Sequence, residues 1–206
     1  MVPRALRTPL SSLLLGAIAA AVVAPSCEDP VHDQEVAALG PENPKIPQGQ
    51  YHRAGQPCTV CHGPEGPAQT QFVVAGTVFW QPFEQATHTN QGELGANNAT
   101  VSLVDDLGSK IEVSTNCVGN FWITPAAYPA AFPLLVKVFA EGTTYTGDMF
   151  TQISRAGSCG QCHGDPPSYD TVGHVYLTTG PVPASEQNVS CPVDPNLADF
   201  ATGAPQ

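Results

Sequence analysis

Two segments of the chain share a pattern of cysteines and a histidine that suits one kind of chemistry. Both read Cys-x-x-Cys-His-Gly, the first at residues 58–63 and the second at residues 159–164. Two thiols three positions apart can form thioethers with the two vinyl groups of one haem, and the next residue can bind the iron. The predicted thioether cysteines are Cys58, Cys61, Cys159 and Cys162, and the predicted proximal iron ligands are His62 and His163.

Chance does not account for this pattern. With 7 Cys and 6 His in 206 residues, one accidental copy has an expectation of about 0.007. Zinc is the physical alternative, because two Cys-x-x-Cys pairs could close one tetrahedral thiolate site. A cytosolic dithiol redox pair is disfavoured because the chain begins with an export signal.

The first 26 residues are typical of a signal peptide. Arg4 and Arg7 are followed by an apolar run from Leu13 to Ala24, and this start contains no acid. The run is too short to span a bilayer comfortably, so residues 1–26 are interpreted as a secretory leader.

The end of the leader resembles that of a bacterial lipoprotein signal peptide, because the small residue Ser26 directly precedes Cys27. The resemblance implies lipidation at Cys27 and a membrane anchor. Ala24 and Pro25 depart from the usual pattern, so secretion with cleavage nearby is the alternative.

The cysteine count supports this assignment. Seven is an odd number for an exported chain. Four cysteines are assigned to haem and Cys27 to lipid, which leaves Cys117 and Cys191. In an oxidising compartment these two are expected to form a disulfide, and two ordinary buried thiols are the alternative.

The exported part is strongly acidic. Removing the two leader arginines from the 7 basic residues leaves five against 18 acidic ones, a formal charge of −13. Nucleic acid is therefore not an expected partner. The acidity suits solubility outside the cytoplasm, and it also suits steering of a basic redox partner protein.

Residues 27–50 contain four prolines, several acids and little apolar periodicity. They are expected to form an extended tether that cannot fold alone. The remaining boundaries follow from the motifs and from the change in the pattern of apolar and turn residues. They are a first haem segment at 51–71, a central domain at 72–151, a second haem segment at 152–178 and a coil tail at 179–206.

The central domain consists of short apolar runs separated by turn residues. β-Branched and aromatic residues at near-alternating positions predict strands rather than helices. The expected strands are 72–80, 99–104, 110–114, 120–123, 134–139 and 143–146. The predicted fold class is mainly β: a small antiparallel Greek-key sandwich flanked by two haem-binding loop segments, with coil termini.

Several runs in this domain resemble the carboxypeptidase regulatory-like domain, a transthyretin-like β-sandwich. They include Ala75-Gly-Thr-Val78, the segment from Thr115 to Phe121 that reads Thr-Asn-Cys-Val-Gly-Asn-Phe, and Phe132-Pro133 before Val136-Lys-Val138. The resemblance covers about two fifths of the chain and implies a fold but no catalytic residue. Cys117 departs from the family's usual pattern.

The sixth ligand of each iron decides between electron transfer and open-site chemistry. His52 and His174 each lie about ten residues from a proximal histidine, and we expect them to be the distal ligands, in either order. Met149 is the alternative for the second haem. His32 and His88 are expected to be exposed bystanders, and His174 could also be a hydrogen-bonded histidine at a strand edge.

Together these features predict a dihaem c-type cytochrome that carries electrons in the bacterial cell envelope, periplasmic or at the cell surface, and not an enzyme. The chain resembles c-type cytochromes only at the two motifs, and the sandwich between them is expected to act as a spacer or scaffold with the haems at its ends. The alternatives are a dihaem peroxidase-like enzyme and an exported binding module with accessory haems.

Overall fold

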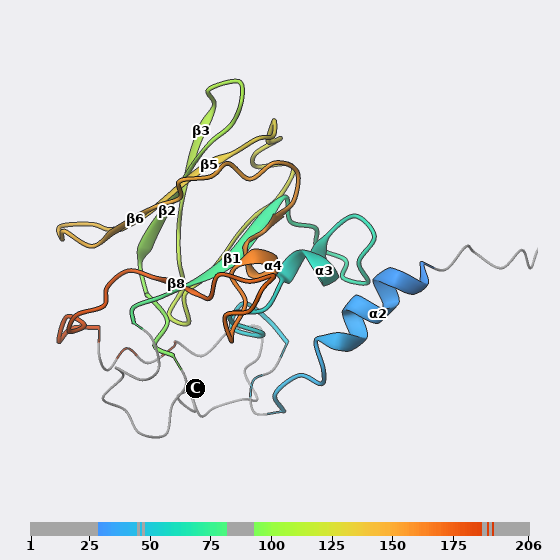
Figure 1. Ribbon diagram of the computed structural model, residues 1–206, viewed down its shortest axis with the longest axis horizontal. Coiled ribbons are helices and arrows are strands. Elements are labelled where there is room, and N and C mark those ends of the chain that lie inside the picture. The colour runs from blue at the N-terminus through green and yellow to red at the C-terminus, as the bar shows by residue number, and fades with distance from the viewer. Residues whose placement is uncertain are drawn as a thin grey trace, which may run out of the picture.

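The computed structural model describes residues 29–44, 46, 48–81, 93–186, 189 and 191. In these residues two β-sheets and a few short helices form a small sandwich (Figure 1). This confirms the predicted mainly β fold class. Cys27 and His88 lie outside the described residues, and within those residues no helix is both long and apolar enough to cross a bilayer.

The first sheet is built around one strand, β1. Its members are β1 (Val74–Phe79), β4 (Asn120–Ile123), β7 (Gly157–Ser158) and β8 (Val175–Tyr176). β4 pairs with β1 in the antiparallel sense, whereas β7 and β8 both pair with it in parallel. The expectation of an antiparallel sandwich is therefore wrong for these two pairings. Strands of two residues are too short to show an alternating pattern in the sequence.

The second sheet has the order β3-β2-β5-β6 and is antiparallel throughout. Its strands are β2 (Ala99–Val104), β3 (Lys110–Ser114), β5 (Leu135–Ala140) and β6 (Thr146–Asp148). β3 alternates between half-buried and exposed side chains, because only one face of this sheet packs against the core.

The core lies between the two sheets. Its largest fully buried side chains are Leu103, Leu134, Val74, Val78 and Val101. Every residue of β1 is buried, which indicates that both faces of this strand are covered. One face packs on the core, and the other is covered by the cysteine motif segments described below.

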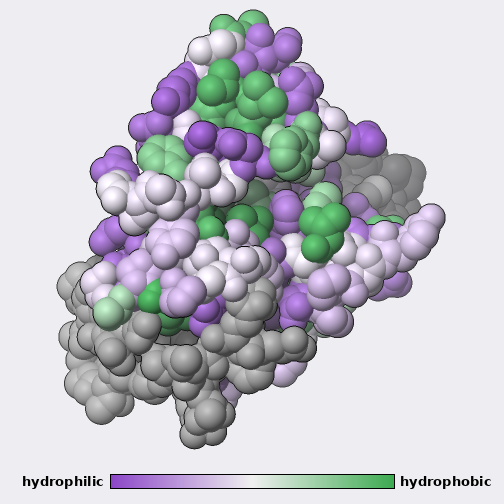
Figure 2. All heavy atoms as spheres, turned by 60° about the vertical axis from the view of Figure 1, so that its left-hand side comes forward, coloured by the Kyte–Doolittle hydropathy of each residue, from purple (hydrophilic) through white to green (hydrophobic). Residues whose placement is uncertain are grey.

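One end of the second sheet is apolar at its surface. Figure 2 shows apolar side chains gathered toward the upper end of the face it presents, with hydrophilic side chains at their border. Leu107, in the turn after β2, and Leu135, which pairs with Val104, are both exposed at this end. The opposite end of the sheet leads into the hairpin that approaches the first motif.

That hairpin, residues 115–119, is fixed by its own side chains. The Asn116 carboxamide oxygen accepts hydrogen bonds from the backbone N–H groups of Val118 and Asn120 at 3.1 and 3.0 Å. Gly119 has a φ of +83°, and its backbone lies close to the carbonyl oxygen of Val78 on β1. The hairpin therefore requires a residue without a Cβ at position 119.

Alanine at Gly119 is expected to lower the free energy of unfolding by about 3 kcal/mol, because left-handed strain adds to a steric clash. A Cβ there would lie 2.0 Å from the Val78 carbonyl oxygen. Gly142 is the matched control, since its φ is +71° but nothing lies within 4 Å of its Cβ position. Gly142→Ala should cost only about 1 kcal/mol. Urea unfolding of the two variants measures the difference, and equal costs would contradict the close contact at Gly119.

The segment before the first motif differs from the expected extended tether. Pro30–Ala38 form helix α2. The Asp29 side chain caps its first turn by accepting from the N–H groups of Val31 and His32, and Pro30 occupies a first-turn position where no N–H is needed. Asp29 followed by Pro30 is a helix start signal, which the interpretation of residues 27–50 as an extended tether did not take into account.

A disulfide joins Cys117 in the hairpin to Cys191 in the tail, with the two Cα atoms 5.3 Å apart. The two residues are 74 positions apart in the sequence. The bond therefore ties the C-terminal segment to the hairpin and restricts the unfolded chain over a long loop.

Candidate functional site

Each Cys-x-x-Cys-His motif begins with a single turn of helix. α3 spans Cys58–His62 and α4 spans Cys159–Cys162. Residues three positions apart lie on the same face of a helix, so each turn presents its two thiols on one side. His163 follows α4 directly, and its N–H donates to the Cys159 carbonyl oxygen at 2.8 Å. This local geometry is the one that two thioether bonds to a single porphyrin need.

Strand β1 positions both motifs. The first motif precedes β1 in the chain, and the second leaves the sheet after β7 and returns at β8, the two strands that pair with β1 in parallel. α4 packs directly on β1, because a Cβ on Gly76 would lie only 2.6 Å from the Cβ of Cys159. Figure 1 shows α3 and α4 beside β1.

The two motif segments also contact each other. A Cβ on Gly160 would lie 2.7 Å from the carbonyl carbon of Gln56 and 2.8 Å from the nitrogen of Pro57, the residue before α3. The expectation that the sandwich separates the two motifs as a spacer is therefore wrong. Both segments lie together on one sheet, because the parallel pairing of β7 and β8 brings the second segment back to β1.

The first cysteine of each motif has a raised thiol pKa. Burial raises the pKa of the Cys58 thiol to about 11 and that of the Cys159 thiol to about 12. The nearby Cys58 also raises the Cys159 pKa. Cys61 is half-buried and Cys162 is exposed.

The haem-free, reduced chain should therefore show unequal thiol reactivity. A pKa of about 12 in place of the ordinary 9.0 lowers the thiolate fraction at neutral pH by about three orders of magnitude, and only the thiolate is alkylated rapidly. We expect iodoacetamide to modify exposed Cys162 at least about tenfold faster than Cys159, as followed by peptide mass spectrometry. Equal rates would contradict the packing of Cys159 on Gly76.

Both predicted proximal histidines have the same hydrogen bond. Nδ1 of His62 lies 2.7 Å from the Thr70 carbonyl oxygen, and Nδ1 of His163 lies 3.0 Å from that of Gly173. A carbonyl oxygen can only accept, so each contact places the ring proton on Nδ1 and leaves the Nε2 lone pair for a metal. Histidines that bind metals are commonly oriented in this way.

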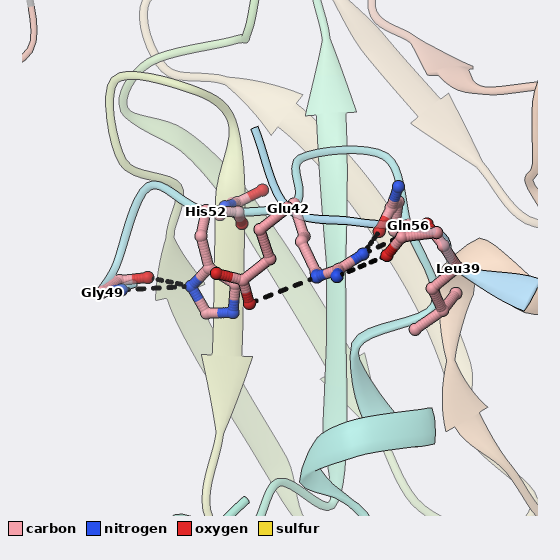
Figure 3. Close-up of polar contacts among 8 residues, drawn as sticks. Leu39, Glu42, Gly49, His52 and Gln56 are labelled. Carbon is pink, nitrogen blue, oxygen red and sulfur yellow. Dashed lines mark hydrogen bonds and ion pairs between the residues drawn. The ribbon is translucent and has the colours of Figure 1, made fainter. Parts of the chain in front are cut away.

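His52 lies next to His62. The two ring centroids are 5.9 Å apart and the ring planes are inclined by 45°. Two imidazoles on opposite sides of one metal, each with a metal–nitrogen bond of about 2 Å, have centroids at a similar separation. Nδ1 of His52 contacts both the carbonyl oxygen and the N–H of Gly49 (Figure 3). Gly49 therefore engages Nδ1, and Nε2 is the ring nitrogen that it does not contact.

Arg53 fixes the loop that carries His52 to helix α2. Its guanidinium donates to the carbonyl oxygens of Leu39 and Gly40 at 3.2 and 2.8 Å, and to the side chains of Gln56 and Glu42 at 2.7 and 3.4 Å (Figure 3). Arg53 itself adopts a φ of +52°. The helix and the loop before the first motif therefore form one connected unit.

His174 has a different environment. Its Nδ1 contacts the Glu93 carboxylate, which also accepts from the Tyr176 hydroxyl, and its ring stacks on Phe79 with centroids 4.7 Å apart. Nε2 would lie 2.9 Å from a Cβ on Gly55, three residues before the first motif. His174 thus belongs to the second segment but faces the loop of the first.

Glu93 is ionised in this arrangement. Burial opposes its ionisation, but the hydrogen bonds from His174 and Tyr176 outweigh burial, and the pKa of Glu93 is lowered. Burial and the nearby Glu93 carboxylate raise the pKa of the Tyr176 hydroxyl, which keeps it protonated as a donor. Glu93 therefore holds His174 in one ring orientation.

The other candidate ligands are placed as follows. His32 is only partly exposed, and its Nε2 is buried without a hydrogen-bond partner among the described residues, so the expectation of a solvated bystander is wrong. Met149 follows β6 at the edge of the second sheet, and its N–H donates to Val136 of β5. The structure does not place Met149 on the sheet that carries the motifs.

No family model matches the chain, and no match was found among curated proteins or solved structures. The site is therefore judged on its own geometry. Within the described residues, no three His, Cys, Asp or Glu side chains are grouped to hold a metal ion, so the four motif thiols do not form the tetrahedral cluster that the zinc alternative needs. Paired thiols on single helical turns, with oriented imidazoles beside them, fit haem c.

Three contributors to the site were not identified from the sequence: Glu93, Tyr176 and Asn120. The first two orient His174, and Asn120 holds the His52 loop from β4. Glu93 and His174 are 81 positions apart. Neither Glu93 nor Tyr176 belongs to a recognisable motif. Asn120 lies in a recognised segment, but that segment indicated only a hairpin.

Proposed function

We propose that the chain is a dihaem c-type cytochrome that carries electrons in the bacterial cell envelope. The thioether residues are Cys58 and Cys61 for the first haem and Cys159 and Cys162 for the second. The observation that carries the proposal is the shared arrangement at the two motifs, where each proximal imidazole is held through Nδ1 by a downstream carbonyl group.

When bound, the haems supply one-electron chemistry at iron. The chain attaches them, orients the ligands and limits access of water. His62 and His163 keep their protons on Nδ1. His52 would serve as the sixth ligand of the first haem, supported by the 5.9 Å separation of its ring from that of His62, and His174 would serve as that of the second. Two imidazole ligands favour a lower reduction potential than one imidazole and one methionine.

The contact between the two motif segments favours electron transfer. Gly160 packs on Gln56 and Pro57, the two residues directly before Cys58. Neighbouring attachment points would allow one haem to pass electrons to the other within the same protein. The sandwich then serves as a rigid base for the pair, consistent with its resemblance to a domain without catalytic residues.

The remaining parts of the proposal concern placement and partners. The leader and Cys27 direct the chain to the periplasm or cell surface, with a lipid anchor in the membrane. The acidic charge suits a basic redox partner protein, and an association of this kind weakens as salt is added.

The test is the holoprotein produced by export in a bacterium with c-type cytochrome maturation. We expect two covalent haems per chain by pyridine haemochrome assay and intact mass, reversible reduction, and low-spin ferric signals by EPR. Bound zinc without haem would overturn the proposal. Peroxide turnover at a high-spin haem would support the enzyme alternative instead.

A further inference from the structure

The segment that resembles the carboxypeptidase regulatory-like hairpin reaches the first motif through its second asparagine. Asn120 is the first residue of β4 and is 7% exposed. Its side-chain amide donates to the carbonyl oxygens of His52 at 3.1 Å and Gln50 at 3.3 Å. The side chain therefore bonds to the backbone of the candidate distal ligand itself.

The other end of the Asn120 side chain is also fixed. Its carboxamide oxygen accepts a 2.7 Å hydrogen bond from the Thr77 hydroxyl on β1, and that hydroxyl accepts one of 2.7 Å from the N–H of Gly55. Asn116 adds a 2.7 Å hydrogen bond from its amide to the Gln50 carbonyl oxygen. β1 and the hairpin thus hold the His52 loop at residues 50, 52 and 55.

We propose that Asn120 is a positioning residue that fixes His52 for binding to the iron of the first haem. The inference rests on the proposed function and goes beyond it, because it assigns a role in ligation to the sandwich. The loop from Gly49 to Pro57 contains only turns before α3, whose internal backbone hydrogen bonds include those of His52 to Gly49 and Gln56 to Arg53. Its other backbone groups need partners outside the loop. Asn120 supplies them from a rigid strand.

Asn120→Asp is the sharpest variant, since it preserves the shape and the oxygen that accepts from Thr77. It replaces the donor amide by an acceptor that faces two carbonyl oxygens, which removes both hydrogen bonds to the loop. We expect the holoprotein to keep both haems but to lose half of its low-spin ferric EPR signal, with a high-spin signal in its place. His52→Ala should give the same spectrum, and added imidazole should restore the low-spin signal in both variants.

Thr115→Val is the matched control for general destabilisation. Thr115 belongs to the same segment and is 2% exposed, but among the described residues its hydroxyl bonds to the backbones of Ala96 and Ala99 and not to the His52 loop. This variant should unfold at lower urea concentration while both haems stay low-spin. Thr77→Val provides a second variant on the same path, and it should show a smaller loss of the low-spin signal than Asn120→Asp.

Proteolysis gives a readout that does not depend on the haem spectrum. Arg53 lies in the held loop, so trypsin should cleave after it at least tenfold faster in Asn120→Asp than in Thr115→Val. The inference would be overturned if Asn120→Asp kept a fully low-spin spectrum while His52→Ala gained a high-spin signal. It would also be overturned if His52→Ala itself kept both haems low-spin. Two low-spin haems in His52→Ala would leave the proposed cytochrome function intact, whereas a wild-type protein without haem would overturn both.

Discussion

Alanine at both Cys58 and Cys61 is expected to give a holoprotein with one covalent haem in place of two. The paired thiols of α3 are the only covalent attachment proposed for the first haem, and His62 alone cannot retain it through denaturing electrophoresis. The second motif packs on β1 through Cys159 and Gly76, so it should keep its own haem. Haem-to-protein ratio and intact mass measure the change.

Two matched variants make this experiment decisive. Alanine at both Cys159 and Cys162 should remove the other haem and leave the first. Alanine at Cys117 and Cys191 replaces the same number of cysteines, but these two form the disulfide, so both haems should remain. Retention of two haems in the Cys58 and Cys61 variant would contradict the assignment of the first motif.

Valine at Gly76 is expected to disrupt the packing of the second motif on β1. Even the Cβ atom would lie 2.6 Å from the Cβ of Cys159 and 3.3 Å from the Phe121 ring. Both neighbours are packed side chains, so relief of the overlap requires movement of α4 away from β1. We expect a loss of about 3 kcal/mol in the free energy of unfolding and reduced occupancy of the second haem.

The control for this variant is the same substitution in the other sheet. Gly147 lies on β6, and nothing is within 4 Å of its Cβ position. Gly147→Val should unfold near the wild-type urea midpoint and carry two haems. Equal stability of the two valine variants would contradict the contact between α4 and β1.

Strands of both sheets could be predicted where β-branched and aromatic residues recur at near-alternating positions. The predicted ranges 99–104, 110–114 and 120–123 match β2, β3 and β4. β7 and β8 could not be predicted, since Gly157–Ser158 and Val175–Tyr176 are too short to form a pattern. Their pairing with β1 depends on contacts between distant parts of the chain. Asp29 and Pro30 form a start signal for α2, but the prolines and acids of residues 27–50 led to the expectation of an extended tether instead.

The candidate site also contains residues that could be predicted from the sequence and residues that could not. The two motifs could be read directly, because covalent chemistry fixes both residue types and spacing. The partners of the distal histidines could not, since Asn120 is 68 positions from His52 and Glu93 is 81 positions from His174. Such pairs are created by the fold, and a single sequence carries no local signal for them.

The parallel pairing of β7 and β8 with β1 also affects the order in which the protein assembles. The first motif is close in sequence to β1, so it can take its place as soon as that strand forms. The second is fixed only when β7 and β8 return to β1 over a long stretch of chain, and contacts between distant residues form slowly because loop closure is costly in entropy. During export from the N-terminus, the proposed cytochrome would therefore complete its first haem-binding segment early and its second segment last.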